Sequence, residues 1–162
     1  MEFWICFCFF AISGVLGFLL GRVLPKKWFR PEGFLFRCRQ FERGGKLYEK
    51  LHIRRWQNHL PDMSRILPGV MPPKNLSGDY AARLPLMLQE TCVAEFIHLF
   101  LCVTGLHSLR LWQGIGGVVV YLIFVIVFNL PYIIIQRYNR PRLMTLYKKL
   151  EAGRSQPIEE AI

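Results

Sequence analysis

Acidic residues are scarce in this 162-residue sequence, which carries 11 aspartates and glutamates against 21 lysines and arginines. The formal net charge is +10. Strongly basic chains often bind nucleic acid, but no recognised nucleic-acid-binding motif is present and the basic residues flank long apolar runs. An anionic membrane surface or an anionic substrate explains the charge better, and we expect no nucleic-acid partner.

Motifs that indicate covalent or metal chemistry are also missing. The five cysteines are an odd number without a C-x-x-C pair, which excludes a disulfide framework and the spacing of a zinc finger. No G-x-S-x-G motif is present to carry a serine nucleophile. We therefore expect no metal site, no resident cofactor and no covalent serine intermediate.

Apolar residues, in contrast, make up 52% of the chain and gather in three long runs. A helix needs about 20 apolar residues to cross the hydrocarbon core of a bilayer. The runs therefore predict an all-α integral membrane protein with a single membrane domain. Its expected parts are transmembrane helices at 3–24, 86–106 and 112–136, a basic cytoplasmic interfacial region at 25–85, and a basic cytoplasmic tail at 137–162.

Charges around the first run predict its orientation. Glu2 precedes the run and Arg22 ends it, which is the wrong order for a cleavable signal peptide. By the positive-inside rule the N-terminus faces out, and three spans then leave the C-terminus in the cytoplasm. We expect a multi-pass protein of a bacterial cytoplasmic membrane. Its first helix remains uncleaved and offers three glycines for close helix packing, at Gly14, Gly17 and Gly21.

The interfacial region is basic and interrupted by prolines. Residues 44–59 predict one short helix that ends before Pro61. Its polar side carries His52, Trp56 and His59 at helical spacing. The stretch that follows, up to the second apolar run, predicts a long loop of the kind that is functional or disordered in small proteins.

The second run contains ionisable residues at a depth where they are costly. On insertion scales a charged residue at the bilayer centre costs roughly 2.5–3.5 kcal/mol. On a helix, Glu95 and His98 share one stripe with Thr91 and Cys102. A carboxylate and an imidazole three residues apart can share a proton, which is the minimum apparatus of general base catalysis. The alternative is that the stripe joins transmembrane helices through hydrogen bonds.

The third run is interrupted near its end by Asn129 and Pro131. A proline inside a span kinks the helix and frees main-chain carbonyls, which must find other partners in lipid. Counted from the cytoplasmic side at 1.5 Å per residue, Glu95 lies about 15 Å deep and Asn129 about 12 Å deep. We therefore expect Glu95, His98, Asn129 and the Pro131 kink to share one depth.

Three motifs together resemble a known family. They are W-x-x-x-L-P at Trp56, Leu60 and Pro61, A-E-x-x-H from Ala94 to His98, and NLPYIIIQRYNRPRL at 129–143. This pattern is similar to the glycosyl diaponeurosporenoate acyltransferases of staphyloxanthin synthesis, and the resemblance covers most of the chain beyond the first helix. In that family an integral membrane enzyme esterifies a sugar hydroxyl of a glycosylated carotenoid acid. The resemblance implies fatty acyl transfer to a hydroxyl of an amphiphilic glycolipid or glycosylated carotenoid.

This reaction assigns a role to each candidate residue. His98 is the expected general base, Glu95 holds its imidazole, and Asn129 or free main-chain N–H groups face the oxyanion. Three arginines after the third run, Arg137, Arg140 and Arg142, hold the phosphates of an acyl-CoA or acyl carrier donor. The full set of expected substrate-binding residues is Trp56, His59, His52, Arg137, Tyr138, Asn139, Arg140 and Arg142.

Two other classes of protein fit parts of the same pattern. A non-enzymatic membrane subunit would use the polar stripe to bind a partner helix. A di-iron enzyme would use Glu95 and His98 as half of its ligand set, with His52, His59 and Glu90 as candidates for the remainder. The partners we expect are the lipid bilayer, the acyl donor and the glycosylated acceptor, and a homo-oligomer is compatible with the sequence.

Overall fold

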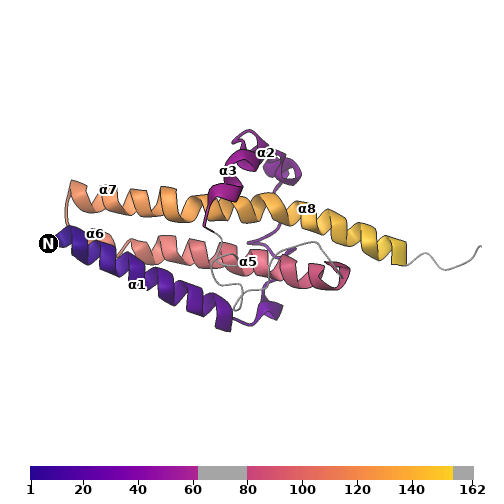
Figure 1. The fold of residues 1–162 in the computed structure, drawn as a ribbon, viewed down its shortest axis with the longest axis horizontal. Coiled ribbons are helices and arrows are strands. Elements are labelled where there is room, and N and C mark those ends of the chain that lie inside the picture. Colours follow the sequence, from indigo (N-terminus) through magenta and orange to yellow (C-terminus); the bar gives the residue numbers. More distant parts are fainter. Residues whose placement is uncertain (62–79, 155–162) are drawn as a thin grey trace, which may run out of the picture.

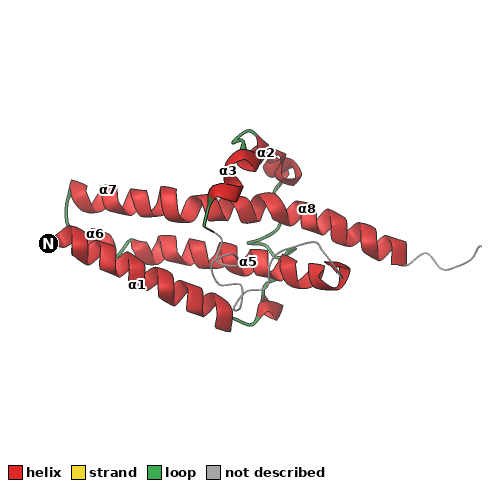
Figure 2. Ribbon diagram, in the orientation of Figure 1, coloured by secondary structure: helices red, strands yellow, loops and turns green. Residues whose placement is uncertain are grey.

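The computed structural model describes residues 1–61 and 80–154 (Figure 1). Every regular element in this part of the chain is helical (Figure 2). The long elements are α1 (Glu2–Val23), α5 (Tyr80–Gly105), α7 (Ile115–Ile123) and α8 (Leu130–Arg154). The short ones are α2 (Lys46–Glu49), α3 (Ile53–Trp56), α6 (Ser108–Leu111) and 3₁₀ turns at Lys26–Trp28, Gln40–Gly45 and Gln57–His59. The predicted loop between Pro61 and Tyr80 lies largely outside the described residues.

Three helical stretches are long and apolar enough to cross a membrane, which confirms the predicted class. They are Glu2–Val23, Ala81–Leu111 and Ile115–Gly153. They lie side by side along the long axis of the molecule (Figure 1). Large apolar side chains such as Trp4, Ile12 and Phe128 are mostly exposed on the outside of this bundle, as expected for surfaces that contact lipid.

Close packing of the first two spans depends on glycine. A Cβ atom at Gly17 would lie 3.2 Å from a methyl carbon of Leu101, and one at Gly21 would lie 3.3 Å from Ile97. Small residues at these positions let the two backbones approach. Gly14 has nothing within 4 Å of its Cβ position, so only two of the three predicted glycines serve this contact.

The third span contains Pro131, where the sequence predicts a kink and freed main-chain carbonyls, and the structure has a π-helical turn just before the proline. A π-helical turn at Phe124–Asn129 joins α7 to α8, and the Leu130 N–H bonds the Val125 carbonyl five residues earlier. In a regular α-helix the Pro131 ring would clash with the carbonyl four residues before it. The wider π turn relieves that clash. The helix then continues through Pro141 to Arg154, so the basic tail begins as its second half.

The predicted single helix at 44–59 is wrong, because the chain breaks into α2 and α3. Arg43, Gly44, Gly45 and His52 all adopt positive φ angles, which interrupt a right-handed helix. At Gly45 an added Cβ would lie 3.1 Å from the Tyr138 carbonyl oxygen, so this turn sits directly on α8. Both short helices pack on α8 through one cluster of buried side chains, Tyr48, Ile53 and Tyr138.

Candidate active site

Glu95 lies fully buried on α5 and accepts hydrogen bonds from two arginines of α8. Its Oε1 atom receives Arg137 Nε at 2.7 Å, and its Oε2 atom receives Arg140 Nη2 at 2.5 Å. Both interactions are charge-assisted and therefore among the stronger hydrogen bonds in proteins. Because the partners lie on different spans, this carboxylate joins the second span to the third.

Arg140 is enclosed by the protein, with 4% of its surface exposed. Besides Glu95, it donates to the Thr91 hydroxyl and carbonyl at 3.0 Å each and to the Phe36 carbonyl at 2.7 Å. These four hydrogen bonds occupy four of the five N–H groups of a guanidinium. In this structure Arg140 is therefore a buried ion whose partners all belong to its own chain.

Arg137 extends the network to the interfacial segment. It donates to Glu42 Oε1 at 2.9 Å and to the Leu35 carbonyl at 2.9 Å. Burial raises the pKa of Glu42, but hydrogen bonds from the Arg39 main-chain N–H, the Tyr48 hydroxyl and Arg137 outweigh it, so the pKa lies below its usual value. Burial, followed by the bond to Glu42, raises the pKa of Tyr48 well above its usual value.

Two buried carboxylates and two arginines thus balance in charge where three segments meet. Taking such ions out of water is costly, and the cost is recovered only when each ion is paired and fully hydrogen-bonded. Every member of this group is paired with an opposite charge and makes further hydrogen bonds through the contacts described above. The network fixes the 34–48 segment, α5 and α8 relative to one another.

His98 lies one helical turn beyond Glu95 and has a different partner. Its Nδ1 atom is 3.1 Å from Asn129 Oδ1, and Asn129 Nδ2 donates to the Phe124 carbonyl at 2.9 Å. Since the amide nitrogen must face that carbonyl, the amide oxygen faces His98. An oxygen there requires a proton on Nδ1 and leaves the Nε2 lone pair of the neutral ring free to act as a base.

Tyr132 fixes the plane of the same imidazole. Its ring is stacked on His98 with centroids 4.7 Å apart and an angle of 6° between the planes. Its hydroxyl donates to the Pro61 carbonyl at 3.1 Å. The histidine is therefore held by hydrogen bonding at Nδ1 and by stacking on one face, both from the third span. Sequence reasoning missed Tyr132, although its position three residues after Asn129 places the two on one helix face.

The structure gives these residues partners other than the predicted ones. Glu95 does not hold His98, because both of its oxygens accept from arginines. Asn129, predicted to face the oxyanion, is buried and bonds His98 and the Phe124 carbonyl. Arg137 and Arg140, predicted to hold donor phosphates, bond the buried carboxylates of Glu42 and Glu95 in this structure.

The remaining predicted substrate-binding residues lie on the interfacial segment or on the part of α8 that packs against it. Arg142 lies over the Tyr138 ring at 3.6 Å and pairs with Glu49, while Tyr138 itself is buried. Trp56 donates its indole N–H to the Leu51 carbonyl. The exposed or partly exposed members of the full set are His52, Trp56, His59, Arg137, Asn139 and Arg142.

The alternative metal site has no assembled ligand set in the described part of the chain. No group of three or more His, Cys, Asp or Glu side chains is placed there to hold an ion. Glu90, a candidate ligand, instead pairs with Lys26 at 2.6 Å. Glu95 is equally unsuited, because its oxygens already carry two arginine bonds.

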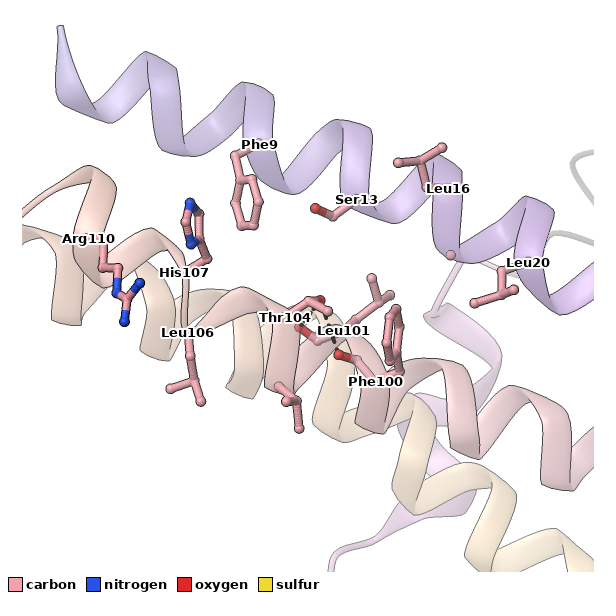
Figure 3. Close-up of a pocket in the computed structure, with 12 residues that line it drawn as sticks. Phe9, Ser13, Leu16, Leu20, Phe100, Leu101, Thr104, Leu106, His107 and Arg110 are labelled. Carbon is pink, nitrogen blue, oxygen red and sulfur yellow. Dashed lines mark hydrogen bonds between the residues drawn. The ribbon is translucent and has the colours of Figure 1, made fainter.

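A separate apolar groove of about 650 Å³ lies between α1 and α5 (Figure 3). Phe9 and His107 face each other at one end, and Leu20 lies towards the other end. Leu101 and Thr104 of α5 line it, whereas His98 of the same helix bonds Asn129 in the third span. The groove and the His98 site therefore belong to different helix interfaces.

Three membrane-spanning helices with a histidine and a buried ion network between them define a polytopic helical membrane protein. The sequence profile of the glycosyl-4,4'-diaponeurosporenoate acyltransferase family matches residues 25–149. The chain belongs to this family and is an acyltransferase, which confirms the resemblance noted in the sequence.

Named relatives come from several strains of Staphylococcus aureus. Proteins of that name from strains bovine RF122 / ET3-1, USA300 and NCTC 8325 are each 28% identical to this chain over 144 residues. In each case the match covers 82% of this chain and 79% of the relative. No solved structure matches the chain.

Proposed function

We propose that this protein transfers a fatty acyl group to a sugar hydroxyl of a glycosylated carotenoid or a related glycolipid, with His98 as the general base. The relatives' name supports the acceptor class. The observation that carries the mechanism is the hydrogen-bond chain from His98 through Asn129 to the Phe124 carbonyl. That chain sets the tautomer in which Nε2 can accept a proton.

The reaction follows from this arrangement. Nε2 of His98 takes the proton of the sugar hydroxyl while its oxygen attacks the acyl carbonyl carbon of a thioester donor. The tetrahedral intermediate collapses, the carbon–sulfur bond breaks, and the imidazolium returns its proton to the leaving thiolate. Asn129 Oδ1 accepts a hydrogen bond from Nδ1–H of His98 throughout, and this bond stabilises the imidazolium between the two steps. The products are the sugar ester and the free thiol of the carrier.

The depth of His98 suits an amphiphilic acceptor. It lies eight residues beyond Glu90, which pairs with Lys26 just after α1. At 1.5 Å per residue this places the imidazole about 12 Å deeper than that ion pair. A sugar carried on a hydrocarbon chain reaches such a depth, whereas a free sugar does not favour it.

The donor, acyl-CoA or an acyl carrier, approaches from the side that carries the interfacial segment. In the proposed topology this side is cytoplasmic, the N-terminus faces out and the C-terminus faces in. Because Arg137 and Arg140 are occupied, donor phosphates are bound by exposed cations of the segment, among them Arg30, Arg37 and Lys50. Tags at the two termini that report the same side of the membrane would contradict this topology.

A direct assay tests the proposed reaction. The purified protein in nanodiscs receives a labelled acyl-CoA or acyl carrier, together with either a glycosylated carotenoid acid or a simple glycosyl diacylglycerol. Mass spectrometry of the extracted lipids should show a sugar ester that depends on both substrates and on the protein. The absence of an ester with every donor and acceptor, from folded protein, would contradict the proposal.

A further inference from the structure

The groove between α1 and α5 is positioned to hold a hydrocarbon chain. Gly17 brings the two helices together near Leu101, and between there and the Phe9–His107 pair they leave a space of about 650 Å³ (Figure 3). This volume is in the range of small-ligand sites in proteins. Leu16, Leu20 and Phe100 supply apolar walls. Both helices that line the groove are membrane spans, so the acyl chains of the surrounding lipids are the apolar groups available to fill it.

The polar groups of the groove are not spread evenly along it. The Thr104 hydroxyl is turned to its own helix, where it donates to the carbonyls of Phe100 and Leu101. His107 and Arg110 lie together at the end next to the α5–α7 connection. The interior is therefore apolar and one end is basic, which is the pattern of a lipid with a hydrocarbon tail and a charged headgroup.

The charges of the residues that line the groove indicate an anionic headgroup. None of the residues that line the groove is acidic. Within the described part of the chain, the exposed Arg110 guanidinium has neither a hydrogen bond nor an ion pair. A guanidinium at the end of an apolar groove between transmembrane helices suits a phosphodiester group. The two charged oxygens of that group can accept hydrogen bonds from two N–H groups of the arginine at once.

We propose that this groove binds one anionic phospholipid, with an acyl chain between α1 and α5 and the phosphate at Arg110. The site lies between α5 and α1, whereas His98 faces Asn129 of the third span, so the lipid is not the reacting acceptor at His98. It stabilises the position of α1 against α5 at the end where glycine contacts no longer hold the two helices together. In the proposed topology this end faces the outer leaflet.

Three variants test the proposal without an activity assay. Arg110→Gln removes the headgroup contact, Ser13→Phe fills the groove, and Arg55→Gln is a matched control because Arg55 is exposed on the distant interfacial segment. Each protein is purified from membranes that contain phosphatidylglycerol and phosphatidylcholine. The lipid retained per folded protein is then measured by native mass spectrometry.

The wild type and Arg55→Gln should each retain one phosphatidylglycerol in preference to phosphatidylcholine. Arg110→Gln should lose that preference by at least about tenfold, which corresponds to 1.4 kcal/mol. Ser13→Phe should lose both lipids. Equal retention of phosphatidylglycerol by wild type and Arg110→Gln would overturn the proposal, as would retention of phosphatidylcholine or of a carotenoid instead.

Discussion

Glu95 and Arg140 form a buried ion pair at 2.5 Å that ties the second span to the third. Arg137 completes the group at 2.7 Å on the other carboxylate oxygen. The A-E-x-x-H and Q-R-Y-N-R motifs therefore meet in space, but they meet as a structural link. The histidine of the first motif turns to Asn129 instead. Glu95 and His98, which the sequence places in one stripe, therefore bond different residues of the third span.

The first prediction concerns this link. Glu95→Gln leaves Arg140 buried without a counter-ion and Arg137 with Glu42 alone. Breaking a buried pair in this way costs about 3–5 kcal/mol. Equilibrium unfolding in mild detergent should show that loss. Glu49→Gln is the control, because Glu49 pairs with Arg54 and Arg142 near the surface, where such pairs contribute about 0–1 kcal/mol. Equal stabilities for the two variants would argue against a structural role for Glu95.

The second prediction concerns Asn129. Asn129→Leu removes the acceptor for the Nδ1 proton, so the imidazole loses its fixed tautomer and kcat should fall at least about tenfold, or 1.4 kcal/mol in the barrier. Asn129→Asp places a negative charge beside Nδ1, which favours imidazolium. Because the base must be neutral, the acid limb of the kcat–pH profile should move to higher pH in this variant.

Nitrogen NMR of labelled His98 checks the same claim without turnover. The wild type should show a protonated Nδ1 and an unprotonated Nε2 near neutral pH, and Asn129→Leu should show a mixture of tautomers. A wild-type ring protonated on Nε2 would contradict the arrangement.

The third prediction separates the two contacts of Tyr132. Tyr132→Phe keeps the stack on His98 and removes the bond to the Pro61 carbonyl. Tyr132→Leu removes both. If the stack positions the imidazole, kcat should fall clearly in the leucine variant and remain closer to wild type in the phenylalanine variant. A larger loss of kcat in Tyr132→Phe than in Tyr132→Leu would contradict that assignment.

The fourth prediction concerns the turn between α6 and α7. A Cβ atom at Gly117 would lie 1.9 Å from the Trp112 carbonyl oxygen, so Gly117→Ala must displace the backbone there. Gly14→Ala is the matched control, because nothing lies within 4 Å of its Cβ position and alanine favours a helix. Thermal melting in detergent should show a large destabilisation for Gly117→Ala and none for Gly14→Ala.

The fold could be predicted from the sequence further than the site could. Runs of about 20 apolar residues specify spanning helices regardless of tertiary detail, so three spans were predictable. The broken helix at 44–59 was not, because the break between α2 and α3 lies at His52, whose left-handed conformation is not indicated by its residue type. The π turn before Pro131 could not be predicted either, because a proline in an apolar run indicates a kink but not the type of helical turn that accommodates it.

At the site, helical spacing correctly placed His98 and Asn129 at one depth. It could not choose the partner of each polar group. Residues three apart on one helix are neighbours, so Glu95 and His98 were a reasonable pair. In the structure Glu95 bonds Arg137 and Arg140 of the facing helix instead of His98. A buried negative charge is stabilised more by a full positive charge than by a neutral imidazole. That outcome depends on the register of α5 against α8.

The most direct test of the account is the turnover of folded His98→Ala. Wild-type and variant proteins are purified in nanodiscs, checked for equal helicity and elution, and assayed for sugar ester formed per folded molecule. If His98 is the general base, kcat should fall by roughly 10²–10⁴. Glu95→Gln, assayed on the fraction that remains folded, should retain far more turnover than His98→Ala. Near-wild-type ester formation by folded His98→Ala would contradict the assignment of the chemistry to this residue.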